Sequence, residues 1–132
     1  MMLKCGGMTS ILIVDDSPEI VRMPQLVLEG RGSQVFSAHD GHEAMKFLQQ
    51  VSPKPSLILS DLYMPHTDGL QLRNQVRQNP VLHTIPFVVM SAGTTPEMRE
   101  EVFAAGADAF LAQPIKFDML NNIIMNLGVV PA

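Results

Sequence analysis

Acidic residues follow two separate apolar runs of this sequence. Asp15 and Asp16 come directly after the run ILIV, and Asp61 comes directly after SLILS. Ser91 ends a third run, PFVVMS, and the small residue Ala92 follows it. Carboxylates that are held close together repel one another unless a cation compensates their charge. Because hard oxygen ligands with open positions suit Mg²⁺, which often bridges to a phosphoryl group, these residues predict a divalent metal site.

A simpler interpretation is that the aspartates only cap the helices that follow them. An N-cap needs one side-chain acceptor for each helix, whereas Asp15 and Asp16 provide two adjacent carboxylates. This surplus favours the metal site. Ser91 taken alone fits a cap at the start of the next loop equally well, and its place in the set favours a role in the site.

The residues between these polar positions predict alternating strands and helices. Short segments rich in apolar residues predict strands at residues 11–14, 33–38, 56–61, 86–91 and 109–112, and those at 11–14 and 56–61 are expected to be buried. Amphipathic segments predict helices from Ser17-Pro18 to near Gly30 or Gly32 and over residues 41–50, 69–78, 96–105 and 116–127. This alternation indicates a parallel sheet covered on both faces, with right-handed crossovers. In such open sheets ligands bind outside the carboxyl ends of the strands, which is where the polar residues fall.

The first predicted helix contains a proline. Pro24 falls about two turns in, where it removes a backbone donor and clashes with the preceding turn. We therefore expect a kink or a local break there. The apolar stripe expected to face the sheet consists of Ile20, Val21, Leu26, Val27 and Leu28.

Composition limits the class of protein. The chain has 132 residues, of which 46% are hydrophobic and 17% are charged, and this fits one folded domain. Its net charge of -4 disfavours nucleic acid and membrane surfaces as partners. The one cysteine, Cys5, cannot form an internal disulfide, which favours a reducing cytoplasm. The first ten residues do not read as a signal peptide, and no apolar run approaches the length of a membrane span.

The motifs of this chain resemble those of one family, the receiver domains of response regulators in two-component signalling. The resemblance covers about residues 11–127 and rests on ILIVDDSPEI, HDGHEAM, LILSDLYMPHTDG, VVMSAG and GADAFLAQPI, in that order. It implies an α/β fold, the flavodoxin-like doubly wound (βα)5 sandwich, with a five-stranded parallel sheet in the order 2-1-3-4-5. We expect the receiver domain at residues 10–128, a flexible N-terminal tail at 1–9 and a C-terminal tail at 129–132.

The resemblance also implies roles for the polar residues at the strand ends. Asp61 looks like the phosphoacceptor, whose carboxylate attacks phosphorus to give an aspartyl phosphate. Asp16, Asp61 and the backbone carbonyl of Tyr63 look like the Mg²⁺ ligands. Asp15 would assist them directly or through water, and Ser91 looks like the hydroxyl that binds the new phosphoryl group.

Four further positions complete the implied site. Phe110 looks like the aromatic rotamer switch that partners read, although an aromatic residue in a buried strand is usually core. Pro114 looks like the cis proline of the family, and Ala92 leaves room for the phosphoryl group to enter. Gln113 stands where the family has a lysine. Because glutamine is neutral, the pocket keeps an amide that can form a hydrogen bond but loses a positive charge beside three carboxylates.

Two functions remain open. In the first, the chain takes a phosphoryl group on Asp61 from a histidine kinase or a histidine phosphotransfer protein and switches its binding of partners. In the second, it is an atypical receiver that acts as a protein-interaction module without phosphorylation. The intact residues Asp15, Asp16, Asp61 and Ser91 favour the first function. Gln113, and to a lesser degree Pro24, favour the second.

In either case the chain is expected to be a signalling switch and not an enzyme, although a phosphoacceptor would assist its own phosphorylation and dephosphorylation. No Gly-rich phosphate loop follows the first strand, which disfavours a nucleotide-binding fold. The sequence DLYMP lacks the second aspartate that a phosphatase with an aspartyl nucleophile would have. A downstream protein is expected to dock on the face around Phe110, which the last two helices and the fifth strand form.

Overall fold

Strands and helices alternate along the chain in this computed structural model, which describes residues 10–62, 64, 68–91, 95–104, 106–112 and 116–127. The strands are β1 (Ser10–Val14), β2 (Gln34–Ala38), β3 (Leu57–Asp61), β4 (Phe87–Ser91) and β5 (Ala109–Ala112). The helices are α1 (Pro18–Gly30), α2 (Gly41–Gln50), α3 (Gly69–Gln78), α4 (Pro96–Ala104) and α5 (Phe117–Asn126). The predicted order of elements is confirmed, and bounds shift by about one residue, which is usual at the ends of elements.

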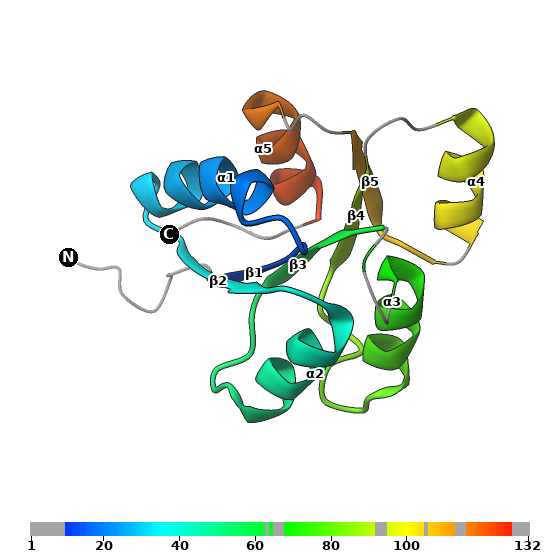
Figure 1. Cartoon of the computed structure of the whole chain (residues 1–132), viewed down its shortest axis with the longest axis horizontal. Helices are drawn as coiled ribbons and strands as arrows, with labels where there is room; N and C mark the ends of the chain where they lie inside the picture. Colours follow the sequence, from blue (N-terminus) through cyan, green and yellow to red (C-terminus); the bar gives the residue numbers. More distant parts are fainter. Residues whose placement is uncertain are drawn as a thin grey trace.

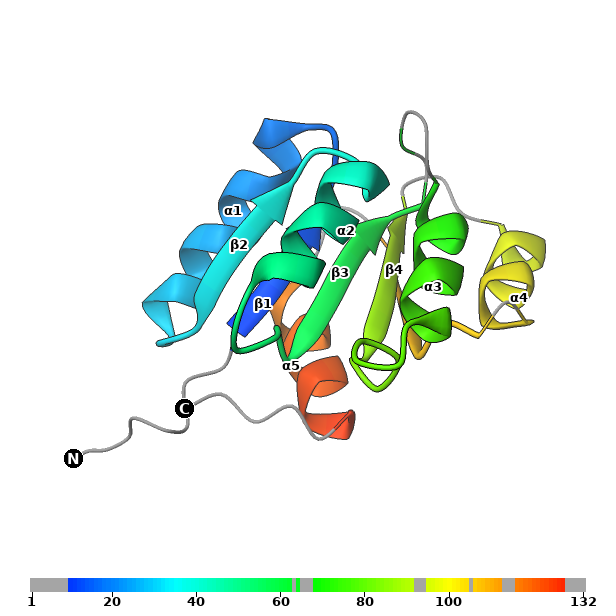
Figure 2. The ribbon, with the colours of Figure 1, turned by 90° about the horizontal axis from the view of Figure 1, so that it is seen from below.

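The strands form one parallel sheet in the order β2-β1-β3-β4-β5, which confirms the predicted topology. α1 and α5 pack on one face, and α2, α3 and α4 pack on the other, with α4 close to β5 at the edge of the sheet (Figure 1). Figure 2 shows this second face, with α2 and α3 in front of the central strands. Among the residues that the structure describes, no helix is long and apolar enough to span a membrane.

The central strands are buried on both faces. Every residue of β1 is buried, and alternate side chains enter two separate apolar clusters. Leu12 and Val14 pack with residues of α2, α3 and α4, whereas Ile11 and Ile13 pack with residues of α1 and α5. β2 lies at an edge and exposes part of its residues. The continuous apolar runs therefore mark the central strands of the sheet, as predicted.

α1 is continuous. It extends over Pro18–Gly30 as one helix, so the local break that the sequence predicts at Pro24 is wrong. Pro24 removes the donor that would bind the carbonyl of Ile20, one turn earlier. Ile20 is 40% exposed, whereas Pro24 is buried. The helix continues through the proline with one backbone hydrogen bond fewer.

The buried stripe of α1 also differs from the predicted one. Val21, Pro24 and Leu28 are buried, with the spacing of three and four residues that a helix requires. Ile20 and Leu26, which were expected to face the sheet, are 40% and 56% exposed. The proline itself thus fills a position against the sheet, and two large apolar residues point towards solvent.

Carboxylate side chains begin α2 and α3. Asp40 accepts a hydrogen bond from the backbone N–H of Glu43 at 2.8 Å. Asp68 accepts from the N–H of Gln71 at 2.8 Å, and the Gln71 side chain accepts from the N–H of Asp68 at 3.0 Å, which completes a capping box. A cap of this kind contributes about 1 kcal/mol to helix stability. α3 therefore begins at a defined residue shortly after β3.

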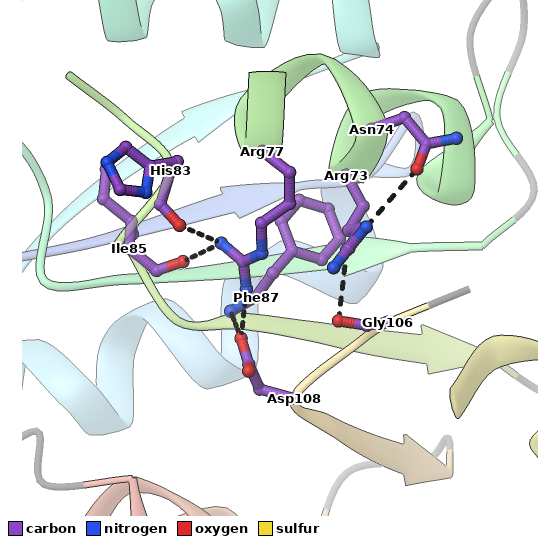
Figure 3. A network of polar contacts seen from close by, with 8 residues as sticks. All are labelled: Arg73, Asn74, Arg77, His83, Ile85, Phe87, Gly106 and Asp108. Atoms are coloured by element: carbon purple, nitrogen blue, oxygen red, sulfur yellow. Dashed lines mark hydrogen bonds and ion pairs between the residues drawn. The ribbon is translucent and has the colours of Figure 1, made fainter. Parts of the chain in front are cut away.

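A cluster of polar contacts joins α3 to the segments that lead into β4 and β5 (Figure 3). Arg77 forms an ion pair with Asp108 at 2.6 Å and donates to the carbonyls of His83 and Ile85 at 2.7 and 2.9 Å. Asp108 also accepts from the backbone N–H of Phe87 at 2.7 Å. One guanidinium and one carboxylate thus tie both strands to α3 at their amino ends.

Arg73, one turn before Arg77, extends this cluster. Its Nε donates to the carbonyl of Gly106 at 3.1 Å. Gly106 has a φ of 98°, which favours glycine, and a Cβ atom there would displace the Arg73 guanidinium from its present position. Burial, followed by the charge of Arg77, lowers the pKa of Arg73 below its usual value, and Asp108 acts in the opposite direction.

Candidate functional site

Three carboxylates meet at the carboxyl ends of β1 and β3. One oxygen each from Asp15, Asp16 and Asp61 lies within 4.8 Å of the others. The register of the sheet explains this arrangement, because Val14 of β1 pairs with Ser60 of β3. The residues that follow this pair, Asp15 and Asp61, therefore emerge side by side. The structure thus brings together the acidic residues that the sequence places at the ends of separate strands.

The three carboxylates differ in their access to solvent. Asp15 is 1% exposed, Asp61 is partly buried, and Asp16 is exposed. A buried carboxylate is costly unless a cation or hydrogen bonds balance its charge. Magnesium takes an octahedral shell of oxygen atoms, in which one or two carboxylates are joined by several waters. An all-oxygen set that opens to solvent at Asp16 fits such an ion.

Asp15 is held by the strand beside it and by the start of α1. Its backbone N–H donates to the carbonyl of Ala38 in β2 at 3.0 Å. Its Oδ1 accepts from the backbone N–H of Ser17 at 2.9 Å, as aspartates do in turns. Ser17 occupies the N-cap position, but in the described part of the chain its side chain makes no capping hydrogen bond. Asp15 therefore supports the start of the helix and also contributes to the acidic cluster.

The backbone around Asp61 is fixed by neighbours on two sides. The N–H of Leu62 donates to the carbonyl of Met90 at 2.9 Å and extends the pairing of β3 with β4. The hydroxyl of Ser60 donates to the carbonyl of Asp61 at 3.0 Å. The N–H of Gly69, at the start of α3, donates to the carbonyl of Leu62 at 2.8 Å. These bonds hold the backbone from which the Asp61 carboxylate projects.

Gly69 packs directly against this backbone. A Cβ atom at Gly69 would lie 2.5 Å from the carbonyl oxygen of Asp61 and 3.1 Å from the Cα of Leu62. A Cβ contact of 2.5 Å with backbone essentially never occurs, so a glycine is required unless the end of β3 moves. The types of residue in the sequence do not reveal this role. The available signal is the place of Gly69 directly after Asp68, the N-cap of the helix that follows the acidic strand.

Ser91 lies at the same edge of the sheet. It is the last residue of β4 and is 1% exposed. Asp61 pairs with Met90 in the neighbouring strand, so Ser91 is the next residue beyond the position opposite Asp61. On its other side Ser91 pairs with Ala112 of β5. The register therefore places this hydroxyl residue at the rim that carries the carboxylates, and its role in binding a phosphoryl group stays a prediction.

Phe110 is a core residue. It is 8% exposed and pairs with Val89 of β4. The guanidinium carbon of Arg99 lies 5.7 Å from the centre of its ring. The interpretation of Phe110 as a core aromatic is confirmed, and its role as a switch stays a prediction. Arg99 was not expected near it, because no sequence pattern relates one residue of a helix to one residue of the next strand.

Four predicted site residues lie outside the described part of the chain. They are Tyr63, Ala92, Gln113 and Pro114. The carbonyl ligand of the metal, the room for the phosphoryl group, the replacement of the lysine and the cis proline therefore stay predictions. The predicted tails at 1–9 and 129–132 lie outside the described residues as well.

Comparison with known proteins identifies relatives of this chain. Residues 11–125 match the family model described as Response regulator receiver domain. Response regulator Rre1 of Synechocystis sp. is 34% identical over 119 residues, which cover 89% of this chain and 51% of that protein. The chain thus spans about half the length of this relative.

Solved structures give the same result. The signal receiver domain of a signal transduction histidine kinase from Syntrophus aciditrophicus aligns with a TM-score of 0.81 at 34% identity, over 90% of this chain and 89% of that chain. The chemotaxis response regulator CheY4 of Vibrio cholerae aligns with a TM-score of 0.81 at 30% identity, over 91% of this chain and 98% of that chain.

Proposed function

Because this chain belongs to the family of response regulator receiver domains, we propose that it is a phosphoacceptor switch of two-component signalling. A histidine kinase or a histidine phosphotransfer protein supplies the phosphoryl group, and Asp61 receives it. The observation that carries this proposal is the meeting of Asp61 with Asp15 and Asp16, whose oxygens lie within 4.8 Å of one another at the open edge of the sheet.

In the proposed reaction an oxygen of the Asp61 carboxylate attacks the phosphorus of a phosphohistidine. A phosphorus–oxygen bond forms, the phosphorus–nitrogen bond breaks, and its electron pair returns to the imidazole of the donor. Nucleophile and phosphoryl group are both negative, and Mg²⁺ would offset their repulsion when bound by Asp16, Asp61 and the carbonyl of Tyr63, with Asp15 directly or through water. The fixed backbone around Asp61 holds the attacking oxygen in place, which reduces the entropy cost of the reaction.

Other groups at the rim bind the product. The Ser91 hydroxyl donates to a phosphoryl oxygen, and Ala92 beside it leaves room for the group to enter. Gln113 presents an amide where relatives of this type have a charged lysine, so the site relies more on the metal for charge balance. With these groups the domain assists both its own phosphorylation and its own dephosphorylation.

The switch is read on the face that α4, β5 and α5 form, in the cytoplasm. Phe110 lies beneath this face, and α4 and α5 flank β5 at one edge of the molecule (Figure 1). Exposed apolar side chains are present on both helices, with Phe103 at 47% and Met119 at 49% exposure. A downstream protein docks on such a surface, whereas the net charge of -4 disfavours direct binding of nucleic acid or of a membrane.

The alternative function, an interaction module that works without phosphorylation, rests mainly on Gln113 and to a lesser degree on Pro24, which the continuous helix α1 accommodates. The neutral side chain weakens the coupling of a phosphoryl group to its surroundings. It does not remove the nucleophile or the acidic cluster, so we favour the phosphoacceptor.

The test is incubation of the protein with acetyl phosphate and Mg²⁺, followed by measurement of the intact mass. One phosphoryl group should be gained, and the gain should be absent from Asp61→Asn. Asp118→Asn, at an exposed position on α5, is the matched control and should be phosphorylated normally. If neither acetyl phosphate nor a phosphorylated histidine phosphotransfer protein modifies Asp61, the proposal is overturned in favour of the alternative.

A further inference from the structure

Arg99 of α4 covers the ring of Phe110 in β5. Its guanidinium carbon lies 5.7 Å from the ring centre, within the range of about 6 Å over which a cation and an aromatic face attract each other. Phe110 is 8% exposed, whereas Arg99 is an exposed residue. The guanidinium therefore lies on the solvent side of a ring that is otherwise part of the core.

This contact ties down a helix that is lightly anchored. Val102 is the buried side chain among the described residues of α4, whereas α3 buries Gly69, Leu72 and Val76. Val102 lies in the second half of α4, and Arg99 lies in the first half. Met98, in the first half, is partly buried and packs against the cluster that contains Phe110. The contact of Arg99 with Phe110 adds a second link between this half of α4 and the core.

The link that follows α4 and leads into β5 is held firmly by α3. Arg73 binds the carbonyl of Gly106 at 3.1 Å, and Arg77 binds the carboxylate of Asp108 at 2.6 Å (Figure 3). Both bound residues lie between the end of α4 and the start of β5. A movement of α4 relative to the sheet would therefore be smallest at Gly106 and largest at the end of the helix that carries Arg99.

We propose that Arg99 holds the Phe110 ring in its buried position and thereby sets how often the ring turns outward. The ring packs among apolar side chains of the core, and the guanidinium adds an attraction between its charge and the face of the ring. An outward turn of the ring breaks this contact and weakens the attachment of the first half of α4, which then depends on the packing of Met98. The consequence for signalling rests on the proposed function, because α4 and Phe110 belong to the face that docks the downstream protein.

The test measures the position of the ring in the unphosphorylated protein by NMR of ring-labelled phenylalanine. The chain has 6 phenylalanines, and Phe110→Leu assigns the signal of interest. Arg99→Gln removes the charge, and it should raise the ratio of outward to inward ring about two- to fivefold. Arg99→Lys keeps the charge but loses the flat guanidinium, and it should give an intermediate ratio. Glu100→Gln, at the exposed neighbouring position, is the matched control and should leave the ratio unchanged.

A second reporter uses fluorescence. The chain has no tryptophan, so Phe110→Trp introduces a single one. Quenching of its fluorescence by acrylamide should increase when Arg99→Gln is added and should not increase with Glu100→Gln. Equal ring signals and equal quenching in the Arg99 and Glu100 variants would overturn the inference.

Both measurements are made without a phosphodonor, so they are independent of the phosphorylation of Asp61. If Asp61 could not be phosphorylated but the ring responded to Arg99→Gln, the failed phosphorylation would contradict the proposed function and the role of Arg99 would stand. If Asp61 were phosphorylated but Arg99→Gln left the position of the ring unchanged, only the role of Arg99 would be contradicted.

Discussion

Gly69 and Asp61 are in direct backbone contact, so that a Cβ atom at Gly69 would lie 2.5 Å from the Asp61 carbonyl oxygen. Gly69 begins α3, and the capping box of Asp68 and Gln71 fixes where this helix starts. The position of the candidate phosphoacceptor therefore depends on the helix that follows it as well as on its own strand.

We predict that Gly69→Ala shifts the end of β3. The added methyl group is overpacked against the backbone, which should lower the free energy of unfolding by about 1–3 kcal/mol. Urea denaturation measures this loss, and titration with Mg²⁺ should show weaker binding. Gly30→Ala is the matched control, because a Cβ atom at Gly30 would meet nothing within 4 Å. Equal stability of the two variants would show that the contact of Gly69 with Asp61 is not rigid.

The buried carboxylate of Asp15 gives a second prediction. Asp15→Asn keeps an oxygen that can accept from the N–H of Ser17, which Asp15 binds at 2.9 Å, but removes the negative charge. Mg²⁺ should bind about 10- to 100-fold more weakly, the usual cost of altering a group that supports a metal. Asp15→Ala should weaken Mg²⁺ binding by the same factor. It should also lower the free energy of unfolding by about 1 kcal/mol, because the hydrogen bond from the Ser17 N–H is lost. Full metal affinity in Asp15→Asn would exclude Asp15 from the site.

A third prediction concerns the residue at the lysine position. Gln113→Lys should phosphorylate about fivefold faster with acetyl phosphate, because a hydrogen bond from a charged donor is stronger than one from an amide by about 1 kcal/mol. The same variant should bind Mg²⁺ no more tightly, since the ammonium relieves part of the repulsion that the metal otherwise offsets. Gln50→Lys, at an exposed position at the end of α2, controls for the change in net charge. Tighter metal binding in Gln113→Lys would refute this account of the substitution.

The ion pair of Arg77 with Asp108 gives a fourth prediction. The pair is partly exposed, with side-chain exposures of 21% and 34%, so the pair alone contributes no more than about 1 kcal/mol. Asp108 also accepts from the N–H of Phe87 at 2.7 Å, and Phe87 is fully buried. Asp108→Ala leaves this buried donor without its acceptor and should cost about 2 kcal/mol in urea denaturation.

Asp108→Asn separates these two contributions. Its side-chain oxygen can still accept from the Phe87 N–H, so we expect it to retain most of the stability that Asp108→Ala loses. If the two variants were equally unstable, the charge of Asp108 would matter more than its hydrogen bond to the strand. Glu100→Gln, at an exposed position outside this cluster, should leave the stability nearly unchanged.

Much of the architecture follows from local patterns. The runs ILIV and LILS became β1 and β3, which are buried on both faces, because a strand between two layers of helices needs apolar side chains on both sides. The acidic residues lie where these runs end, so their meeting at one edge is a consequence of parallel strands. α1 shows the limit of this reasoning, since Pro24 occupies the buried stripe where Leu26 was expected. The face that a helix turns towards a sheet depends on its docking angle, which residue types alone do not specify.

The sequence by itself determined the order of strands and helices, the family that the motifs resemble and the identity of the acidic residues at the site. Each of these depends on residue types within short segments and on the order of those segments along the chain. Only the tertiary structure decided that Gly69 lies against Asp61, that Arg77 binds Asp108 and that Arg99 covers Phe110. These contacts join different elements, and their geometry is set by how the helices pack on the sheet.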